Sequence, residues 1–178
     1  MIYVVVGSSG SGKTTIVDIL LKETLLEKLV TCTTREIRSE DIPDISYHFL
    51  TKEEFNIQVK NGEFVEHTIY ANNMYGSRYK EFDEAIKKGK DIIVIMDIYG
   101  AKFIKEKYPN DSMSIFILRD RTSLIKTILA RDVSDDVKLQ RVVQLDEDEK
   151  AMSQCDVIVK NDNLENAITI IKKLMMYN

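Results

Sequence analysis

The stretch VVVGSSGSGKTTI, from Val4 to Ile16, carries the strongest local signal for the fold of this chain. It matches the pattern G-x-x-x-x-G-K-[ST], whose fixed positions are held by Gly7, Gly12, Lys13 and Thr14. A plain turn is the competing interpretation, because Gly and Ser are common in loops, but a turn needs no Lys and Thr after its last Gly. The pattern is expected between a buried strand and a helix. Apolar β-branched residues precede it and apolar residues at helical spacing follow it, so we interpret it as a phosphate-binding loop.

The residue types of this loop suit the binding of a nucleoside triphosphate. Glycines let backbone N–H groups surround phosphate oxygens without obstruction by side chains, and the helix that follows points its positive end at the same anion. Lys13 would contact the β- and γ-phosphates, and the hydroxyl of Thr14 would hold Mg²⁺. The predicted phosphate-binding residues are Gly7, Ser8, Ser9, Gly10, Ser11, Gly12, Lys13, Thr14 and Thr15.

The composition is that of a globular protein with one domain. The 178 residues are enough for one sizeable core, and 44% hydrophobic with 30% charged residues is ordinary for a soluble fold. The net charge of −4 argues against a general nucleic-acid-binding protein. No apolar run approaches the length of a membrane span, and we expect no signal peptide, since the first strand begins at Ile2. Cys32 and Cys155 lack metal-ligand spacing, so we expect reduced thiols in a cytoplasmic protein.

Short apolar runs alternate with helical patterns, which predicts an α/β fold with a parallel sheet and helices on both faces. The expected strands are Ile2–Val6, Leu29–Cys32, Ile92–Asp97, Met113–Leu118 and Val157–Val159. The expected helices are Lys13–Lys22, Tyr99–Lys107, Thr122–Ala130, Val137–Met152 and Leu164–Met176. Ligands of such sheets bind at the carboxyl ends of the strands, where we expect Gly7, Thr31 and Asp97.

Two segments interrupt this alternation. Residues 33–88 have irregular polar spacing with short strand-like and helical pieces, and we expect them to form a small inserted α+β lobe. Residues 131–150 are heavily charged, and we expect a helical lid there. The core would then consist of residues 1–32, 89–130 and 151–178. Because no Pro- or Gly-rich linker separates these parts, we expect one domain.

Several polar residues outside the loop are candidates for a site. Arg35 and Arg38 could together hold one phosphate, although solvated surface arginines fit the spacing as well. Glu66 could accept hydrogen bonds from the N1–H and 2-amino groups of guanine, or it could be an exposed strand residue. Asp97 ends a strongly apolar strand, where a charge needs a partner or a ligand such as Mg²⁺ or a substrate, unless it is a carboxylate at a helix N-terminus.

The charged segment after residue 130 carries two further arginines, Arg131 and Arg141. Phosphoryl transfer spreads negative charge over the transferred group, and arginines carried by a closing lid can stabilise that charge. Salt-bridged helix arginines are the alternative. The acidic run Asp146–Glu149 is interpreted as a solvated helix face.

Taken in order, these residues resemble the guanylate kinase family over nearly the whole chain. The phosphate loop is shared by many families, but the series T-x-TTR-x-x-R, Y-x-F, GEF-x-E, YGS, D-x-x-G-x-K and a late V-x-ND is far more specific. The resemblance implies a parallel-sheet core with a nucleoside-monophosphate lobe and a lid. It also implies phosphoryl transfer from ATP to GMP or dGMP, giving ADP and GDP, with Mg²⁺ as cofactor.

The resemblance further implies roles for individual residues. The guanine would be contacted by Thr31, Glu66 and Asp97, and Ser77 would reach the base or adjacent groups of GMP. The GMP phosphate would be held by Arg35, Arg38, Tyr47 and Tyr75. The transferring phosphoryl group would be stabilised by Lys13, Arg131 and Arg141. Asn161 would lie near the adenine of ATP, and Thr14 would hold the metal.

A few positions depart from the family pattern. Ile95 and Tyr99 replace an aspartate and a glutamine, and Thr127 replaces an arginine. These changes leave two alternatives open: a kinase of the same fold with another phosphorylated acceptor, and a catalytically weak guanylate kinase-like module that binds a protein partner. The hydroxyl of Thr31 and the carboxylate of Glu66 argue against a sugar phosphate, and the complete phosphate loop argues against the weak module. The sequence indicates neither an oligomeric state nor a preference between GMP and dGMP.

Overall fold

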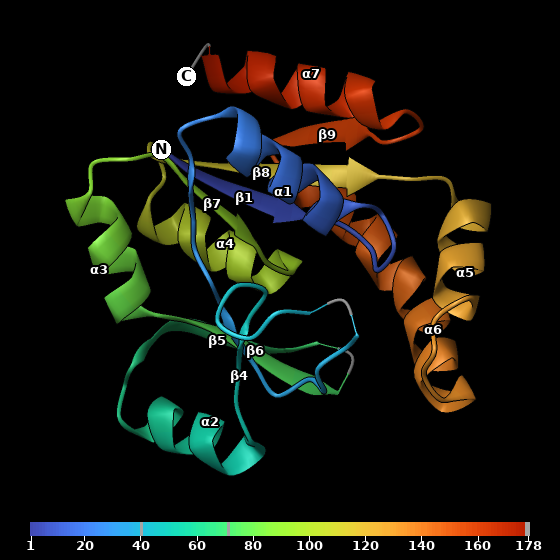
Figure 1. The fold of residues 1–178 in the computed structure, drawn as a ribbon, viewed down its shortest axis with the longest axis horizontal. Helices are drawn as coiled ribbons and strands as arrows, with labels where there is room; N and C mark the ends of the chain where they lie inside the picture. Colours follow the sequence, from blue (N-terminus) through green and yellow to red (C-terminus); the bar gives the residue numbers. More distant parts are fainter. Residues whose placement is uncertain (40, 71, 177–178) are drawn as a thin grey trace.

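The structure is a computed structural model, and it describes residues 1–39, 41–70 and 72–176. Its larger sheet has the strand order β2-β7-β1-β8-β9, and all neighbouring strands in it are parallel. The strands are β1 Ile2–Val6, β2 Glu27–Lys28, β7 Ile92–Ile95, β8 Ser112–Leu118 and β9 Val157–Lys160. Helices cover both faces of this sheet (Figure 1), so the α/β class predicted from the sequence is confirmed.

Strand β1 is the central strand of the larger sheet, and every one of its residues is hydrophobic and buried. Its odd-numbered residues pack with α1 (Lys13–Glu23) and α7 (Leu164–Met176) on one face. Its even-numbered residues pack with α3 (Tyr79–Lys87) and α4 (Ile98–Lys107) on the other face. A strand that is apolar at every position is thus covered on both sides, as parallel sheets require.

A smaller sheet has the strand order β4-β3-β6-β5 and lies below the larger one in Figure 1. Its strands are β3 Cys32–Thr33, β4 His48–Phe49, β5 Phe64–Tyr70 and β6 Asn73–Arg78. Helix α2 (Lys52–Lys60) begins at a capping box, and its Phe55 ring stacks on Phe64 at 4.6 Å between centroids. Apart from Cys32, these strands and α2 fall within the segment predicted as an inserted α+β lobe.

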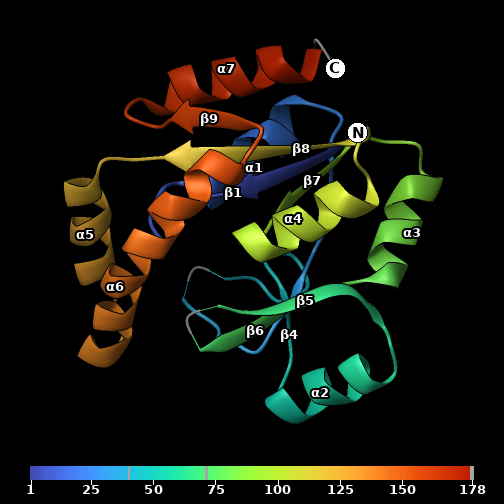
Figure 2. The ribbon, with the colours of Figure 1, turned by 180° about the vertical axis from the view of Figure 1, so that it is seen from behind.

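Helices α5 (Arg121–Leu129) and α6 (Asp135–Ala151) form an arm that extends away from the larger sheet (Figure 2). They pack on each other through Leu124, Ile128 and Leu145. A short 3-10 turn at Met152–Gln154 then leads into β9. The arm extends toward the side of the molecule on which the smaller sheet lies. The arm and the smaller sheet together flank the phosphate loop.

The strand expected at Leu29–Cys32 is wrong. The chain forms two short strands instead: β2 pairs with β7 in the larger sheet, and β3 pairs with β4 and β6 in the smaller one. The residues between them pass from one sheet to the other, so Thr31 lies at this crossing and not at the end of a strand of the larger sheet. Among the described residues, no helix is long and apolar enough to cross a membrane.

Candidate active site

A cavity of about 1000 Å³ lies between the phosphate loop, the smaller sheet and α6. It brings together most of the residues that the sequence singles out. These are Gly7, Ser9, Gly10, Gly12, Lys13, Thr14, Thr15, Thr31, Arg35, Arg38, Tyr47, Glu66, Tyr75, Asp97, Arg131 and Arg141. The cavity therefore contains a cationic region at the phosphate loop and an acidic region at Glu66 and Asp97.

The phosphate loop connects β1 to α1 and has positive φ at Gly7, Gly10 and Gly12, a conformation that favours glycine. Gly7 has φ of 144°, and a Cβ there would lie 2.7 Å from the main-chain oxygen of Ile117. Gly12 caps α1 with φ of 95°, and a Cβ there would lie 2.5 Å from Nδ2 of Asn161. The loop thus leads directly into the N-terminus of α1, where the helix dipole favours an anion.

Lys13 lies at the cationic end of the cavity. Its Nζ donates hydrogen bonds to the main-chain oxygens of Gly7 at 2.6 Å and Ser8 at 2.9 Å. Burial, together with the charges of nearby arginines, lowers the pKa of Lys13 to about 8, although the carboxylate of Asp148 acts in the opposite direction. A bound phosphate would place a negative charge beside this ammonium group and so favour its protonated form.

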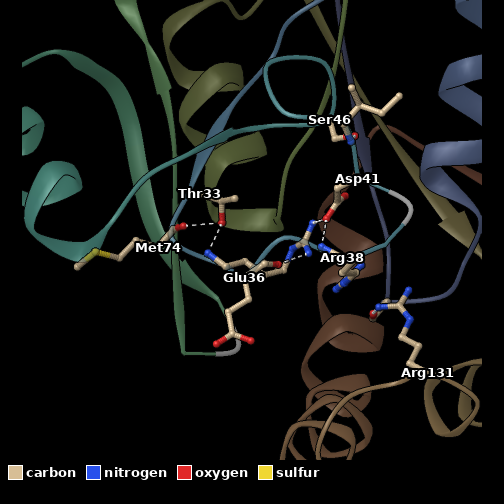
Figure 3. Close-up of polar contacts among 10 residues, drawn as sticks. Thr33, Glu36, Arg38, Asp41, Ser46, Met74 and Arg131 are labelled. Carbon is tan, nitrogen blue, oxygen red and sulfur yellow. Dashed lines mark hydrogen bonds and ion pairs between the residues drawn. The ribbon is translucent and has the colours of Figure 1, made fainter.

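Arg131 and Arg141, from the charged segment, both form hydrogen bonds to the same atom of the phosphate loop. Nη1 of Arg131 and Nη1 of Arg141 donate to the hydroxyl of Ser9, at 3.1 Å and 2.8 Å. Figure 3 shows Arg131 extending toward the loop that carries Arg38. Burial and the charges of Arg35, Arg131 and Arg141 together lower the pKa of Arg38 to about 10. Such a concentration of cations is suited to phosphate groups.

Arg35 is held in place by an acidic partner that the sequence analysis did not single out. Its Nη2 donates to Oδ2 of Asp41 at 2.8 Å, and the two side chains are only 7% and 9% exposed. Its guanidinium also lies over the rings of Tyr47 and Phe49, at 5.3 Å and 5.6 Å. The same Asp41 oxygen accepts from the backbone N–H of Arg38, so one carboxylate orders the loop that presents both arginines.

The acidic end of the cavity contains Glu66 of β5 and Asp97, which caps α4. Burial raises the pKa of Glu66 to about 7, against the effect of the Ser77 hydroxyl that donates to it at 2.7 Å. Burial also raises the pKa of Asp97, although the backbone N–H groups of Gly100 and Tyr99 lower it. Oδ2 of Asp97 is buried and has no hydrogen-bond partner among the described residues. Within the part of the chain that the structure describes, neither carboxyl forms a salt bridge, and both can accept hydrogen bonds from a ligand.

Four of the predicted residues lie behind the cavity wall. Ser77 is fully buried and orients Glu66. Asn161 donates to the main-chain oxygen of Ser11 at 2.8 Å, so it supports the phosphate loop from outside the cavity. Ser8 and Ser11 are buried within the loop. The side chains of this group therefore support the site, while the loop's backbone remains available to a ligand.

A sequence model of the guanylate kinase family matches residues 1–178, which is the whole chain. The chain belongs to the guanylate kinase family.

Individual relatives agree with this family assignment. The guanylate kinase of Clostridium acetobutylicum is 34% identical over 178 residues, covering 99% of this chain and 85% of that protein. The guanylate kinase of Bartonella quintana is 30% identical, covering 98% of this chain and 80% of that protein. The crystal structure of guanylate kinase from Anaplasma phagocytophilum is similar in fold, with a TM-score of 0.77 and 24% identity over 99% of this chain and 85% of that one.

Besides Asp41, the sequence of this guanylate kinase family member did not point to Tyr70 and Asp148, which also line the cavity. Asp148 belongs to the acidic run interpreted as a solvated helix face, yet it lines the cavity and accepts a hydrogen bond from Tyr70. That interpretation is wrong for Asp148, because it lies on the face of α6 that also presents Arg141 to the cavity. The spacing of seven residues was the available signal, since it places two side chains on one face of a helix.

Proposed function

We propose that this protein is a guanylate kinase, which transfers the terminal phosphoryl group of ATP to GMP or dGMP and releases ADP and GDP or dGDP. The observation that carries this proposal is the polarity of the cavity. Its cationic end suits the phosphates of both substrates, and its acidic end suits a base that presents two N–H donors. Guanine has such an edge, with N1–H beside the 2-amino group.

The phosphate loop is the proposed site for ATP. Lys13 would leave the loop's main-chain oxygens and contact the transferring phosphate, where its ammonium group offsets the developing charge. The exposed hydroxyl of Thr14 lines the cavity and fits a ligand of Mg²⁺. No cluster of three acidic, His or Cys ligands occurs in the described part of the chain, so the metal would be held mainly by nucleotide phosphates and water. Bound Mg²⁺ would neutralise phosphate charge.

The acceptor is proposed to lie between the two ends of the cavity. Arg35 and Arg38 would hold the phosphate of GMP, together with the phenol groups of Tyr47 and Tyr75. The rings of these tyrosines lie 6.1 Å apart edge to face, and both line the cavity. Ionised Glu66 and Asp97 would accept from the guanine edge, with the side chain of Thr31 beside them.

The chemical step requires positioning and charge stabilisation more than covalent participation by the protein. A phosphate oxygen of GMP forms a bond to the γ-phosphorus, the bond from that phosphorus to the β–γ bridging oxygen breaks, and ADP leaves with the electron pair. Arg131 and Arg141 are already directed at the phosphate loop through Ser9. Nε of Arg141 is buried and has no hydrogen-bond partner among the described residues, so it can donate to a transferring phosphoryl oxygen.

We also propose that the predicted parts act as units: a core, an acceptor lobe at residues 33–88 and a lid at residues 131–150. Closure of the lobe and lid would exclude water, which would otherwise hydrolyse ATP. Both Cys32 and Cys155 are free thiols, in keeping with the cytoplasmic location that we propose.

The proposal is tested by measuring ADP formation from ATP and Mg²⁺ with GMP, dGMP, AMP, CMP, UMP or no acceptor. We expect turnover with GMP and dGMP alone. Turnover with AMP, CMP or UMP at a similar rate would contradict the assigned role of the acidic end. ATP binding that depends on Lys13, without turnover on any acceptor, would contradict the proposed reaction and favour another acceptor or a silent module.

A further inference from the structure

Asp148 differs from its acidic neighbours on α6. Asp146 is typical of a solvated face, because it pairs with Arg121 and its side chain is 63% exposed. Asp148 is partly buried and lines the cavity instead. The other cavity-lining residues on this face of the helix include Arg141 and Gln144, at the spacings of three, four and seven residues that place side chains along one side of a helix.

Asp148 bonds to the smaller sheet. The phenol of Tyr70, the last residue of β5, donates to its carboxylate, at 3.0 Å from Oδ2 and 3.2 Å from Oδ1. Burial and the adjacent carboxylate raise the pKa of Tyr70 well above its usual value, so the phenol remains a donor. The contact joins two parts of the molecule that are 78 residues apart in the chain.

Asp148 also faces the phosphate loop. Burial raises the pKa of its carboxyl, while the hydrogen bond from Tyr70, the charge of Lys13 and the hydroxyl of Ser8 lower it. In return its negative charge raises the pKa of Lys13. The carboxylate is therefore the point at which α6, the smaller sheet and the phosphate loop meet.

We propose that Tyr70 and Asp148 form a latch that fastens α6 to the smaller sheet and thereby holds Arg141 over the phosphate loop. This inference rests on the proposed function, because it assigns Arg141 a role in phosphoryl transfer. Tyr70 and Asp148 are positioning residues: they act by fixing the rotation and tilt of α6, and Arg141 acts on the substrate.

The position of Tyr70 links the latch to the acceptor side of the cavity. Its ring packs edge to face on that of Tyr75 at 6.4 Å, and Tyr75 packs in the same manner on Tyr47 at 6.1 Å. Tyr47 in turn lies under the guanidinium of Arg35. A rigid row of aromatic side chains thus connects the proposed acceptor-phosphate residues to the helix that carries Arg141.

The first test measures the latch without using activity. Spin labels on Asn56→Cys in α2 and Gln140→Cys in α6 report the distance between the smaller sheet and the arm in the substrate-free protein, since both positions are exposed. Burial raises the pKa of Cys32 to about 12 and that of Cys155 to about 11, so both native thiols should label slowly. We expect a narrow distance distribution that broadens in Tyr70→Phe, and an unchanged distribution in Tyr70→Phe would overturn the latch.

The second test is a double-mutant cycle on GMP phosphorylation. Removing a buried hydrogen bond to a charged group corresponds to roughly a tenfold loss or more, so Tyr70→Phe should lower kcat about tenfold while KM for ATP changes less than about twofold. Tyr70→Phe with Asp148→Ala should be no slower than Asp148→Ala alone, because the two residues act through one bond. Asp148→Asn keeps an oxygen acceptor and should retain more activity than Asp148→Ala.

Matched controls separate the latch from general effects on folding. Tyr79→Phe removes a phenol hydroxyl outside the cavity and keeps the ring over Lys107, and Asp146→Asn removes an aspartate from the exposed side of α6. Both should match the unaltered protein in rate and distance distribution. Additive losses in the double-mutant cycle would overturn the latch. If GMP is not phosphorylated at all, the proposed function fails, while the distance measurement still decides whether the latch exists.

Discussion

The guanidinium of Arg141 donates a 2.8 Å hydrogen bond to the hydroxyl of Ser9, 132 residues away in the sequence. Helix α6 is thereby already directed at the phosphate loop in the substrate-free molecule. The Arg141 guanidinium retains a buried Nε without a hydrogen-bond partner among the described residues, so this helix brings an unused donor to the place where phosphoryl transfer would occur.

Replacing Arg141 by Lys should lower kcat by about a hundredfold to a thousandfold, because lysine keeps the charge but loses the planar set of donors that stabilises a phosphoryl group. Steady-state rates with GMP varied at saturating ATP would measure this loss. Arg121→Lys is the matched control, since Arg121 pairs with Asp146 and Glu149 at the surface. A similar loss in both variants would contradict a specific role for Arg141.

Lys13→Ala should abolish turnover with little loss of stability. The ammonium group is desolvated and surrounded by arginines, which lowers its pKa to about 8, so its removal relieves an unfavourable charge in the free protein. Initial rates and thermal unfolding of the same preparation would check both parts. Turnover at the unaltered rate would contradict the phosphate-loop assignment.

Asp41→Asn should raise KM for GMP and leave KM for ATP nearly unchanged. The carboxylate pairs with Arg35 and accepts from the backbone N–H of Arg38, and an amide is a weaker, uncharged partner for both. Because the pair is buried, breaking it should also cost stability, on the order of 3 kcal/mol when one charge is left unpaired. Asp44→Asn, at an exposed position in the same loop, is the control, and an equal rise of KM in both variants would argue against the role of Asp41.

The pH dependence of GMP binding should follow Glu66. Its pKa is raised to about 7, and only the ionised carboxylate accepts from both N–H groups of the guanine edge. KM for GMP should therefore rise as pH falls below about 7, while KM for ATP should not. Glu66→Gln should remove this dependence and raise KM for GMP at pH 8, and a pH profile identical to that of the unaltered protein would exclude Glu66 as its source.

The raised pKa of Glu66 also determines the direction in which the stability of the ligand-free protein changes with pH. Because the folded-state pKa lies above the ordinary value of 4.5, the contribution of Glu66 to stability is complete below pH 4.5 and is lost as pH rises through 7. Glu66→Gln should thus be more stable than the unaltered protein at pH 8, by up to about 3 kcal/mol. The two should converge near pH 4, as measured by denaturant unfolding.

The fold could be predicted because its signals are local. The apolar run of β1, the glycine spacing after it and the helical periodicity of α1 and α7 each depend on neighbouring residues, and the structure confirms them. The strand expected at Leu29–Cys32 was wrong, because apolar residues alone do not show which sheet they join. That depends on pairing with β7, β4 and β6, which are distant in the sequence.

The site was predicted less completely, for a related reason. Lys13, Glu66 and Asp97 could be found from motifs, but the partners that position them depend on tertiary packing. Asp41 and Asp148 look like ordinary surface acids in the sequence, and only the folded chain brings them to Arg35 and Tyr70.

Guanine recognition by the acidic end of the cavity is tested by comparing GMP with IMP as acceptors, with ATP and Mg²⁺ fixed at saturation. IMP keeps the phosphate, ribose and N1–H of GMP but lacks the 2-amino group, so a buried acceptor would be left unpaired. We predict phosphorylation of GMP to GDP and a value of kcat/KM for IMP lower by roughly a hundredfold or more, as expected when a polar site loses its partner. Equal values for GMP and IMP, or no GDP formation, would contradict the claim that Glu66 and Asp97 recognise guanine in a phosphoryl-transfer site.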